Sequence, residues 1–189
     1  MAQAKVLDQK EVKRVFAVIA NSKHAARNRI AFALTYYAGL RVKEVAELKF
    51  RDCYDNNGQA LSEIQLRADQ TKGNKGRKVI INTKLQRELN DYAKTVPNSN
   101  NMSSIVGSQK GNGFSPNSLA QLFRHIYELA GVTGATSHSG RRSFITDLAN
   151  KGVGAKVLMT LAGHKNLATT QRYIEVNDGQ LRQAAELMS

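Results

Sequence analysis

The stretch from Thr136 to Tyr173 most restricts what this chain can form, because it combines helical spacing of apolar residues with a cluster of side chains that bind anions. His138 directly follows Ser137, a residue type that caps helices, and Arg141 comes three residues after His138. We therefore expect both side chains on one face of a helix's first turn. Unpaired backbone N–H groups and the helix dipole attract an anion at such a position.

Two further candidates lie at the ends of the next predicted elements. His164 directly follows Gly163 at the end of an apolar run, and Tyr173 comes later, in what we expect to be another short helix. The pattern predicts that one phosphate contacts His138, Arg141, His164 and Tyr173. Taken singly, such a tyrosine or histidine is more often structural. A zinc site is not expected, because no cysteine or carboxylate cluster accompanies the histidines.

The rest of the chain is predicted to be mostly helical. Asp8 and Glu11 have the spacing of a capping box for a first helix, and Gly39 is suited to end a second. Between residues 49 and 82 the apolar spacing changes to that of short strands separated by turns. Further helices are expected at residues 42–48, 83–96, 115–129 and 178–189, the third of them with Leu119, Leu122, Phe123, Ile126 and Leu129 on its buried face. The prediction is an α+β fold, mostly helical, with a small antiparallel β-sheet.

The charge of the chain indicates its partner. Lys and Arg number 28 against 15 for Asp and Glu, which gives a formal net charge of +13. This bias suits nucleic acid better than an acidic protein surface, although basic residues can also be a solvated face. Cys53 is the only cysteine, so a reducing compartment is the simplest setting. Without a membrane-spanning apolar run or a signal-peptide core, we expect a soluble intracellular protein with no membrane partner.

In order and spacing, these residues resemble the tyrosine recombinases, the phage-integrase and Xer family. The family's second box is matched by His-x-x-Arg at 138–141, by Leu-Ala-Gly-His at 161–164 and by Tyr173. Its first box is matched by Gly-Leu-Arg at 39–41 with the acidic Glu44, and its hairpin lysine by Lys72, before a Gly-Asn turn. The resemblance covers roughly residues 5 to 185 and is far more specific than a lone short motif.

The resemblance implies an enzyme that cuts and rejoins double-stranded DNA, for integration, excision or inversion. Its catalytic residues would be Arg41, Lys72, His138, Arg141, His164 and Tyr173. Tyr173 is the implied nucleophile, which forms a 3′-phosphotyrosyl link, and Lys72 is the implied general acid for the leaving 5′ oxygen. The two arginines bind phosphate oxygens in forked pairs, and the histidines add donors or accept the tyrosine proton. No cofactor and no metal are implied, because the arginines supply the positive charge.

Three further expectations concern the residues near this catalytic set. Arg41 and Glu44 share the side of the helix at residues 42–48 that lies away from the buried Val45 and Leu48, and without the second box an ordinary surface ion pair would be the simpler interpretation. The cations at 75, 77 and 78 contact the DNA backbone generally or are solvated turn residues. Ser139-Gly140 replaces an apolar residue more common in the family, and this should loosen the helix start.

The resemblance also implies an assembly. Most members carry an extra N-terminal helical domain that closes around DNA, so we expect here a short recombinase or a fragment. Residues 1–189 are expected to form a single catalytic domain, with a tail helix at about 178–189 that docks on a neighbour in a homo-tetramer on DNA. The expected location is the cytoplasm, at the nucleoid, in a bacterial or phage-encoded system.

Two other functions are compatible with the same residues. A type IB topoisomerase uses similar Arg, Lys, His and Tyr chemistry but acts as a monomer on one duplex. A DNA-binding architectural or regulatory protein could keep the fold and lose turnover. The short second box and the Gly-His turn favour a recombinase, and the complete catalytic set argues against a loss of turnover.

Overall fold

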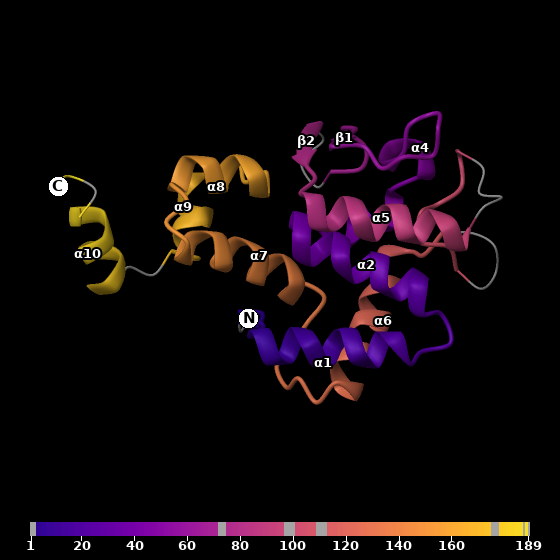
Figure 1. Ribbon diagram of the computed structural model, residues 1–189, viewed down its shortest axis with the longest axis horizontal. Helices are drawn as coiled ribbons and strands as arrows, with labels where there is room; N and C mark the ends of the chain where they lie inside the picture. Colours follow the sequence, from indigo (N-terminus) through magenta and orange to yellow (C-terminus); the bar gives the residue numbers. More distant parts are fainter. Residues whose placement is uncertain are drawn as a thin grey trace.

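Helices dominate the computed structural model, which describes residues 3–71, 75–96, 101–108, 113–174, 178–186 and 188. These residues confirm the predicted class, mostly helical with a small antiparallel sheet (Figure 1). The elements in chain order are α1 Gln9–Ala20, α2 Ala25–Ala38, α3 Val42–Glu47, α4 Phe50–Cys53, β1 Glu63–Leu66, β2 Arg77–Ile80, α5 Thr83–Thr95, α6 Pro116–Leu129, α7 Ser139–Asn150, α8 Ala155–Ala162, α9 Leu167–Gln171 and α10 Asp178–Glu186.

The central helix is α2, which packs against α1, α5 and α7. Every residue from Ile30 to Tyr36 is buried, because the helix is apolar on nearly all sides. The Phe32 ring stacks on Tyr36 with centroids 5.7 Å apart and meets Tyr127 of α6 edge-on at 6.3 Å. The predicted ends are confirmed: Asp8 and Glu11 form the capping box of α1, and Gly39 ends α2 in the left-handed conformation.

The sheet is a hairpin in which β1 and β2 pair antiparallel, with Leu66 opposite Arg77. Ile64, Leu66 and Val79 are buried, so one face of the hairpin packs on the core. In the connection between the strands the backbone N–H of Lys75 donates to the Thr71 hydroxyl (3.3 Å). Lys72, which was predicted on the turn of this hairpin, lies outside the described residues.

The prediction that Leu129 is a core residue is wrong. Leu129 at the end of α6 is 60% exposed, whereas Tyr127 is buried. The buried positions of α6 are Leu119, Phe123, Ile126 and Tyr127, which follow the helical period. At about 100° per residue, Leu129 lies roughly 80° to one side of Leu119, whereas Phe123 and Tyr127 lie to the other side, so Leu129 falls outside the stripe.

The start of α7 also differs from the prediction. Ser139 is buried, its hydroxyl accepts the backbone N–H of Thr136 (2.9 Å), and its carbonyl accepts the Ser143 hydroxyl (2.9 Å). A Cβ on Gly140 would lie 2.5 Å from the Thr35 hydroxyl of α2. The two small residues therefore let α7 approach α2 closely, and they fix the helix start rather than loosen it.

The C-terminal helices lie to one side of this core. Figure 1 shows α7, α8 and α9 together at one flank and α10 apart from them at the end of the molecule. Leu181 of α10 is 58% exposed. The predicted tail helix is present from Asp178 to Glu186, while Leu187 and Ser189 lie outside the described residues. None of the helices in the described ranges is long and apolar enough to cross a membrane.

Candidate active site

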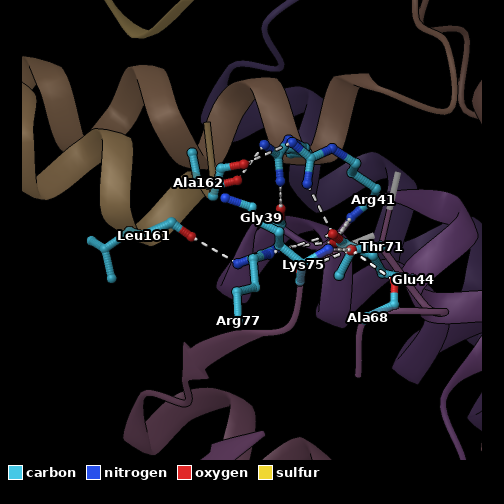
Figure 2. A network of polar contacts seen from close by, with 11 residues as sticks. Gly39, Arg41, Glu44, Ala68, Thr71, Lys75, Arg77, Leu161 and Ala162 are labelled. Carbon is cyan, nitrogen blue, oxygen red and sulfur yellow. Dashed lines mark hydrogen bonds and ion pairs between the residues drawn. The ribbon is translucent and has the colours of Figure 1, made fainter. Parts of the chain in front are cut away.

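At the centre of the candidate site is the carboxylate of Glu44, on α3, whose side chain is fully buried. It accepts the Arg41 backbone N–H (2.7 Å), Arg41 Nη1 (2.9 Å) and Arg77 Nη2 (2.9 Å), and Figure 2 shows these groups converging on it. Burial alone raises the pKa of Glu44, but Arg77 and then Arg41 outweigh it and lower this pKa below its ordinary value. The alternative interpretation, an ordinary surface ion pair, is excluded, because Glu44 is fully buried and two guanidiniums make burial of its charge possible.

Three guanidiniums meet the C-terminal end of α8. The last carbonyls of a helix have no intrahelical partner and carry the negative end of its dipole. Here the carbonyls of residues 161, 162 and 163 accept, in that order, Arg77 Nη1 (3.1 Å), Arg141 Nη2 (2.6 Å) and Arg41 Nη2 (3.1 Å). Arginines from α7, from the hairpin and from the start of α3 are therefore fixed at the end of one helix, and Figure 2 shows two of them, Arg41 and Arg77, in this position.

Arg141 is the most enclosed of the three. Its Nη1 donates to the carbonyl of Gly39 (2.5 Å), so it ties the first turn of α7 to the end of α2. Burial, and then the neighbouring Arg41, lower the pKa of Arg141 to about 9. The guanidinium is still charged at neutral pH. Because its surroundings disfavour that charge, an anion bound beside it would be stabilising.

Gly163 turns the chain so that His164 faces the same region. Gly163 has a φ of +60°, and a side chain there would overlap Arg77. His164 Nδ1 lies 3.0 Å from the hydroxyl of the fully buried Thr170. Burial, and then the three arginines, lower the pKa of His164 to about 4, so its imidazole is neutral at pH 7.

Tyr173 lies two residues beyond α9, not within a helix as predicted. Its backbone N–H donates to the Thr170 carbonyl (2.9 Å) in a tight turn that ends the helix. The Tyr173 ring stacks on His164, with centroids 5.8 Å apart and planes at 25°. Arg142 Cζ lies 5.4 Å from the Tyr173 ring centroid. The tyrosine is thus in contact with an imidazole and a guanidinium.

His138 stands at the N-terminus of α7, and Ser137 does not cap it. The N-cap residue is His138, whose carbonyl accepts the Arg142 N–H (2.9 Å) and whose own N–H donates to the Thr136 hydroxyl (3.2 Å). The helix therefore starts one residue later than predicted. The His138 side chain is exposed, at the open side of the site.

Two clefts give access to these residues, and Thr169 lines both. The smaller cleft, of about 250 Å³, has as its charged and aromatic lining His138, Arg141, Arg142, Arg172 and Tyr173. The larger cleft, of about 490 Å³, is lined by Arg41, Lys75, Arg77, His164 and Lys165, among others. Among the residues described, no Asp or Glu lines either cleft. The structure thus gathers five predicted site residues around two adjoining cationic clefts, while Lys72 lies outside the described residues.

Arg77 was assigned to general backbone contacts or to solvent, yet it holds both Glu44 and the end of α8. The strand period contained a signal for this. Arg77 lies two residues before the buried Val79, so both belong to the core face of β2. A charged residue on a core face needs a buried partner, and the acidic residue of the first box was available.

A metal site is not evident in the ranges described: they contain no group of three or more His, Cys, Asp or Glu residues placed to hold an ion. The chemistry available to the site is that of fixed guanidiniums, a neutral imidazole and a phenol. Such a set is suited to binding a phosphate and attacking it with the phenol oxygen.

Comparison with known proteins supports this description. The sequence matches the model of the phage integrase family over residues 5–180. It is 30% identical over 176 residues to tyrosine recombinase XerC of Lactobacillus delbrueckii subsp. bulgaricus, covering 89% of this chain and 57% of that protein. It is 32% identical over 183 residues to tyrosine recombinase XerA of Pyrococcus horikoshii, covering 96% and 60%.

Solved structures give the same fold. A crystal structure of XerA recombinase has a TM-score of 0.77 at 26% identity and covers 100% of this chain and 66% of that chain. A structure of XerH site-specific recombinase bound to its difH substrate has a TM-score of 0.70 at 24% identity, covering 97% and 54%. The chain spans 57% to 62% of the length of such sequence relatives.

The lowered pKa of His164 predicts a pH dependence of stability. Between pH 6.5, the ordinary histidine value, and about 4, the unfolded chain binds a proton that the folded chain does not. The free energy of unfolding should therefore fall as pH falls through this window, by about 1 to 2 kcal/mol after allowing for the partly exposed ring. Thermal unfolding measured at pH 7 and pH 5 should show a smaller loss in His164→Gln than in the wild type.

His125 provides the matched control, because it is an exposed histidine on α6. His125→Gln should keep the wild-type pH dependence. An equal pH dependence in His164→Gln and the wild type would show that His164 is not shifted.

Proposed function

Because the chain belongs to the phage integrase family, we propose that it is a site-specific DNA recombinase that cleaves and rejoins strands through Tyr173. The observation that carries the proposal is the contact of Tyr173 with the neutral His164, beside Arg41 and Arg141 at the end of α8. The relatives named above are recombinases, so a topoisomerase or a non-catalytic DNA-binding protein is not favoured. Acting on chromosomal DNA, such an enzyme works in the cytoplasm, at the nucleoid.

In the proposed reaction the scissile phosphate binds at the two guanidiniums. Arg41 and Arg141 each donate some of their N–H groups to backbone carbonyls or to Glu44. Because a guanidinium has five N–H donors, each arginine keeps further donors for phosphate. The carbonyl contacts hold the guanidiniums in place before DNA binds, so little reorganisation is needed when charge builds up on the phosphate oxygens.

Tyr173 then attacks phosphorus. A bond forms between its phenol oxygen and phosphorus, the bond to the 5′ oxygen breaks, and a 3′-phosphotyrosyl link remains. His164 Nδ1 is hydrogen-bonded with the Thr170 hydroxyl, so Nε2 is the imidazole nitrogen available to the reacting groups. Exposed His138 is the second candidate to accept the phenol proton. Reversal of the step with another 5′ hydroxyl rejoins the strand.

We propose Lys72 as the general acid that gives a proton to the leaving 5′ oxygen. The support is its place in the sequence, before the Gly-Asn turn of the hairpin that Arg77 anchors. Lys75, the described lysine nearest to Lys72 in the sequence, lines the larger cleft and is the competing candidate for the general acid.

The first prediction tests the nucleophile. Tyr173→Phe, which loses only the phenol oxygen, should bind DNA normally but form no covalent adduct. The substrate is a nicked duplex carrying a site that the protein itself has selected from a random-sequence pool, and adducts are detected on denaturing gels. Tyr37→Phe is the control, since Tyr37 lies on α2 and packs against Phe16; it should form adduct as the wild type does. An adduct with Tyr173→Phe would place the nucleophile elsewhere.

The second prediction separates the two lysines. General acid catalysis contributes about a hundred- to ten-thousandfold, so Lys72→Ala should slow cleavage by that order, whereas Lys75→Ala should mainly weaken binding. A substrate with sulfur at the bridging 5′ position loses a thiolate, which needs no proton. That substrate should restore cleavage by Lys72→Ala but not by Arg41→Ala. Restoration with Lys75→Ala instead would make Lys75 the acid.

The assembly is also part of the proposal. We take residues 1–189 as one catalytic domain whose tail helix α10 docks on a neighbouring subunit, four subunits acting on two duplexes. In support, α10 stands apart from the other helices and exposes the apolar Leu181, and so short a helix is marginal alone (Figure 1).

The third prediction tests this docking. Deletion of residues 178–189 should abolish cooperative binding to a duplex with two sites and spare binding to a single site, because the tail contacts protein and not DNA. Gel-shift titrations on one-site and two-site duplexes measure both. Arg124→Met, on the exposed side of α6, should retain cooperativity. Cooperativity unchanged by the deletion would reject the docking role of the tail.

A further inference from the structure

Arg142 differs from the other arginines of the site in its contacts. We propose that it is a positioning residue for the nucleophile, its guanidinium holding the Tyr173 ring in the place from which the phenol attacks. The inference rests on the proposed function, because it concerns the step that Tyr173 performs. It adds a residue that neither motif of the family resemblance includes.

The hydrogen bonding of Arg142 differs from that of the other site arginines. Arg41, Arg77 and Arg141 each donate to backbone carbonyls or to Glu44. By contrast, Arg142 Nε is buried and finds no acceptor in the described part of the chain. Buried donors are almost always paired, so an unpaired one calls for an explanation. The guanidinium is placed for its contact with an aromatic ring, Tyr173, at 5.4 Å, rather than for a structural hydrogen bond.

The position of Arg142 on α7 supports this. Consecutive helical residues point about 100° apart, so Arg141 and Arg142 reach different targets from the same turn. Arg141 reaches the carbonyls of Gly39 and Ala162, while Arg142 reaches Tyr173. One rigid helical turn thus sets the distance between a phosphate-binding guanidinium and the nucleophile.

This placement has a stability cost. Two cations in the first turn of α7 lie at the positive end of its dipole, where cations are disfavoured. Residues placed against a local stability rule are expected at functional sites. The Tyr173 ring also needs support, because it lies beyond the end of α9, and its ring contacts are His164 and Arg142.

The test measures single-turnover cleavage of the nicked duplex at saturating protein. Arg142→Met keeps much of the side-chain length and removes the cation, and it should lower the cleavage rate about three- to thirtyfold, the range for a partly buried cation–π contact. The protein concentration that half-saturates the DNA should change less than twofold. Arg142→Lys keeps an ammonium near the ring and should recover part of the rate.

Two other arginines serve as comparisons. Arg172→Met removes the same charge from the smaller cleft, next to Tyr173 in sequence, and should act mainly on the protein concentration that half-saturates the DNA. Arg124→Met, on α6 and paired with Glu128, should leave both quantities at wild-type values. A wild-type cleavage rate in Arg142→Met would overturn the inference, as would equal losses in the Met and Lys variants or a loss confined to binding.

A measurement without DNA tests the role of Arg142 independently of the proposed function. In protein with ¹³C-labelled tyrosine rings, the Tyr173 resonance is identified by its absence in Tyr173→Phe. It should move toward the free-tyrosine position in Arg142→Met, less so in Arg142→Lys, and stay in place in Arg124→Met. An unmoved resonance in Arg142→Met overturns the inference. Failure of the wild type to form an adduct would instead refute the proposed function and leave this readout intact.

Discussion

The structure of the site depends on one buried charge, the carboxylate of Glu44. It holds Arg41 and Arg77 from two distant parts of the chain, and these guanidiniums, with Arg141, hold the end of α8. Without the carboxylate, three like charges would meet in a partly buried region with only helix carbonyls to offset them. The acidic residue of the first box is therefore not a surface partner of its arginine but the common anchor of the site.

One carboxylate does not neutralise the site, and the remaining positive charge has effects on every group nearby. It contributes, after burial, to the lowered pKa values of Arg141 and His164. Burial and the surrounding cations keep the imidazole neutral. A phosphate diester bound at the clefts would offset the excess charge, so the same feature that destabilises the free protein favours the bound state.

Much of this could be predicted from the sequence, since the helix ends at Asp8 and Gly39 and the spacing of the two boxes follow local rules. What could not be predicted depends on packing between distant segments. The burial of Glu44 required Arg77, more than thirty residues away. The fit of Gly140 against Thr35 inverted a local expectation of looseness, because the helix start is stabilised by its neighbour and not by its own propensity.

The close contact of Gly140 with Thr35 has a consequence for how such chains can diverge. Since a side chain at 140 would overlap the buried side chain of Thr35, the packing of these two helices links the residue types at 140 and 35, and sequence change at one is restricted by the other. The first and second boxes approach each other through these helices, so a change at 140 has to be matched by a change at 35. A chimera that takes α2 from one relative and α7 from another would combine two complete motifs and still misplace the arginines that they carry.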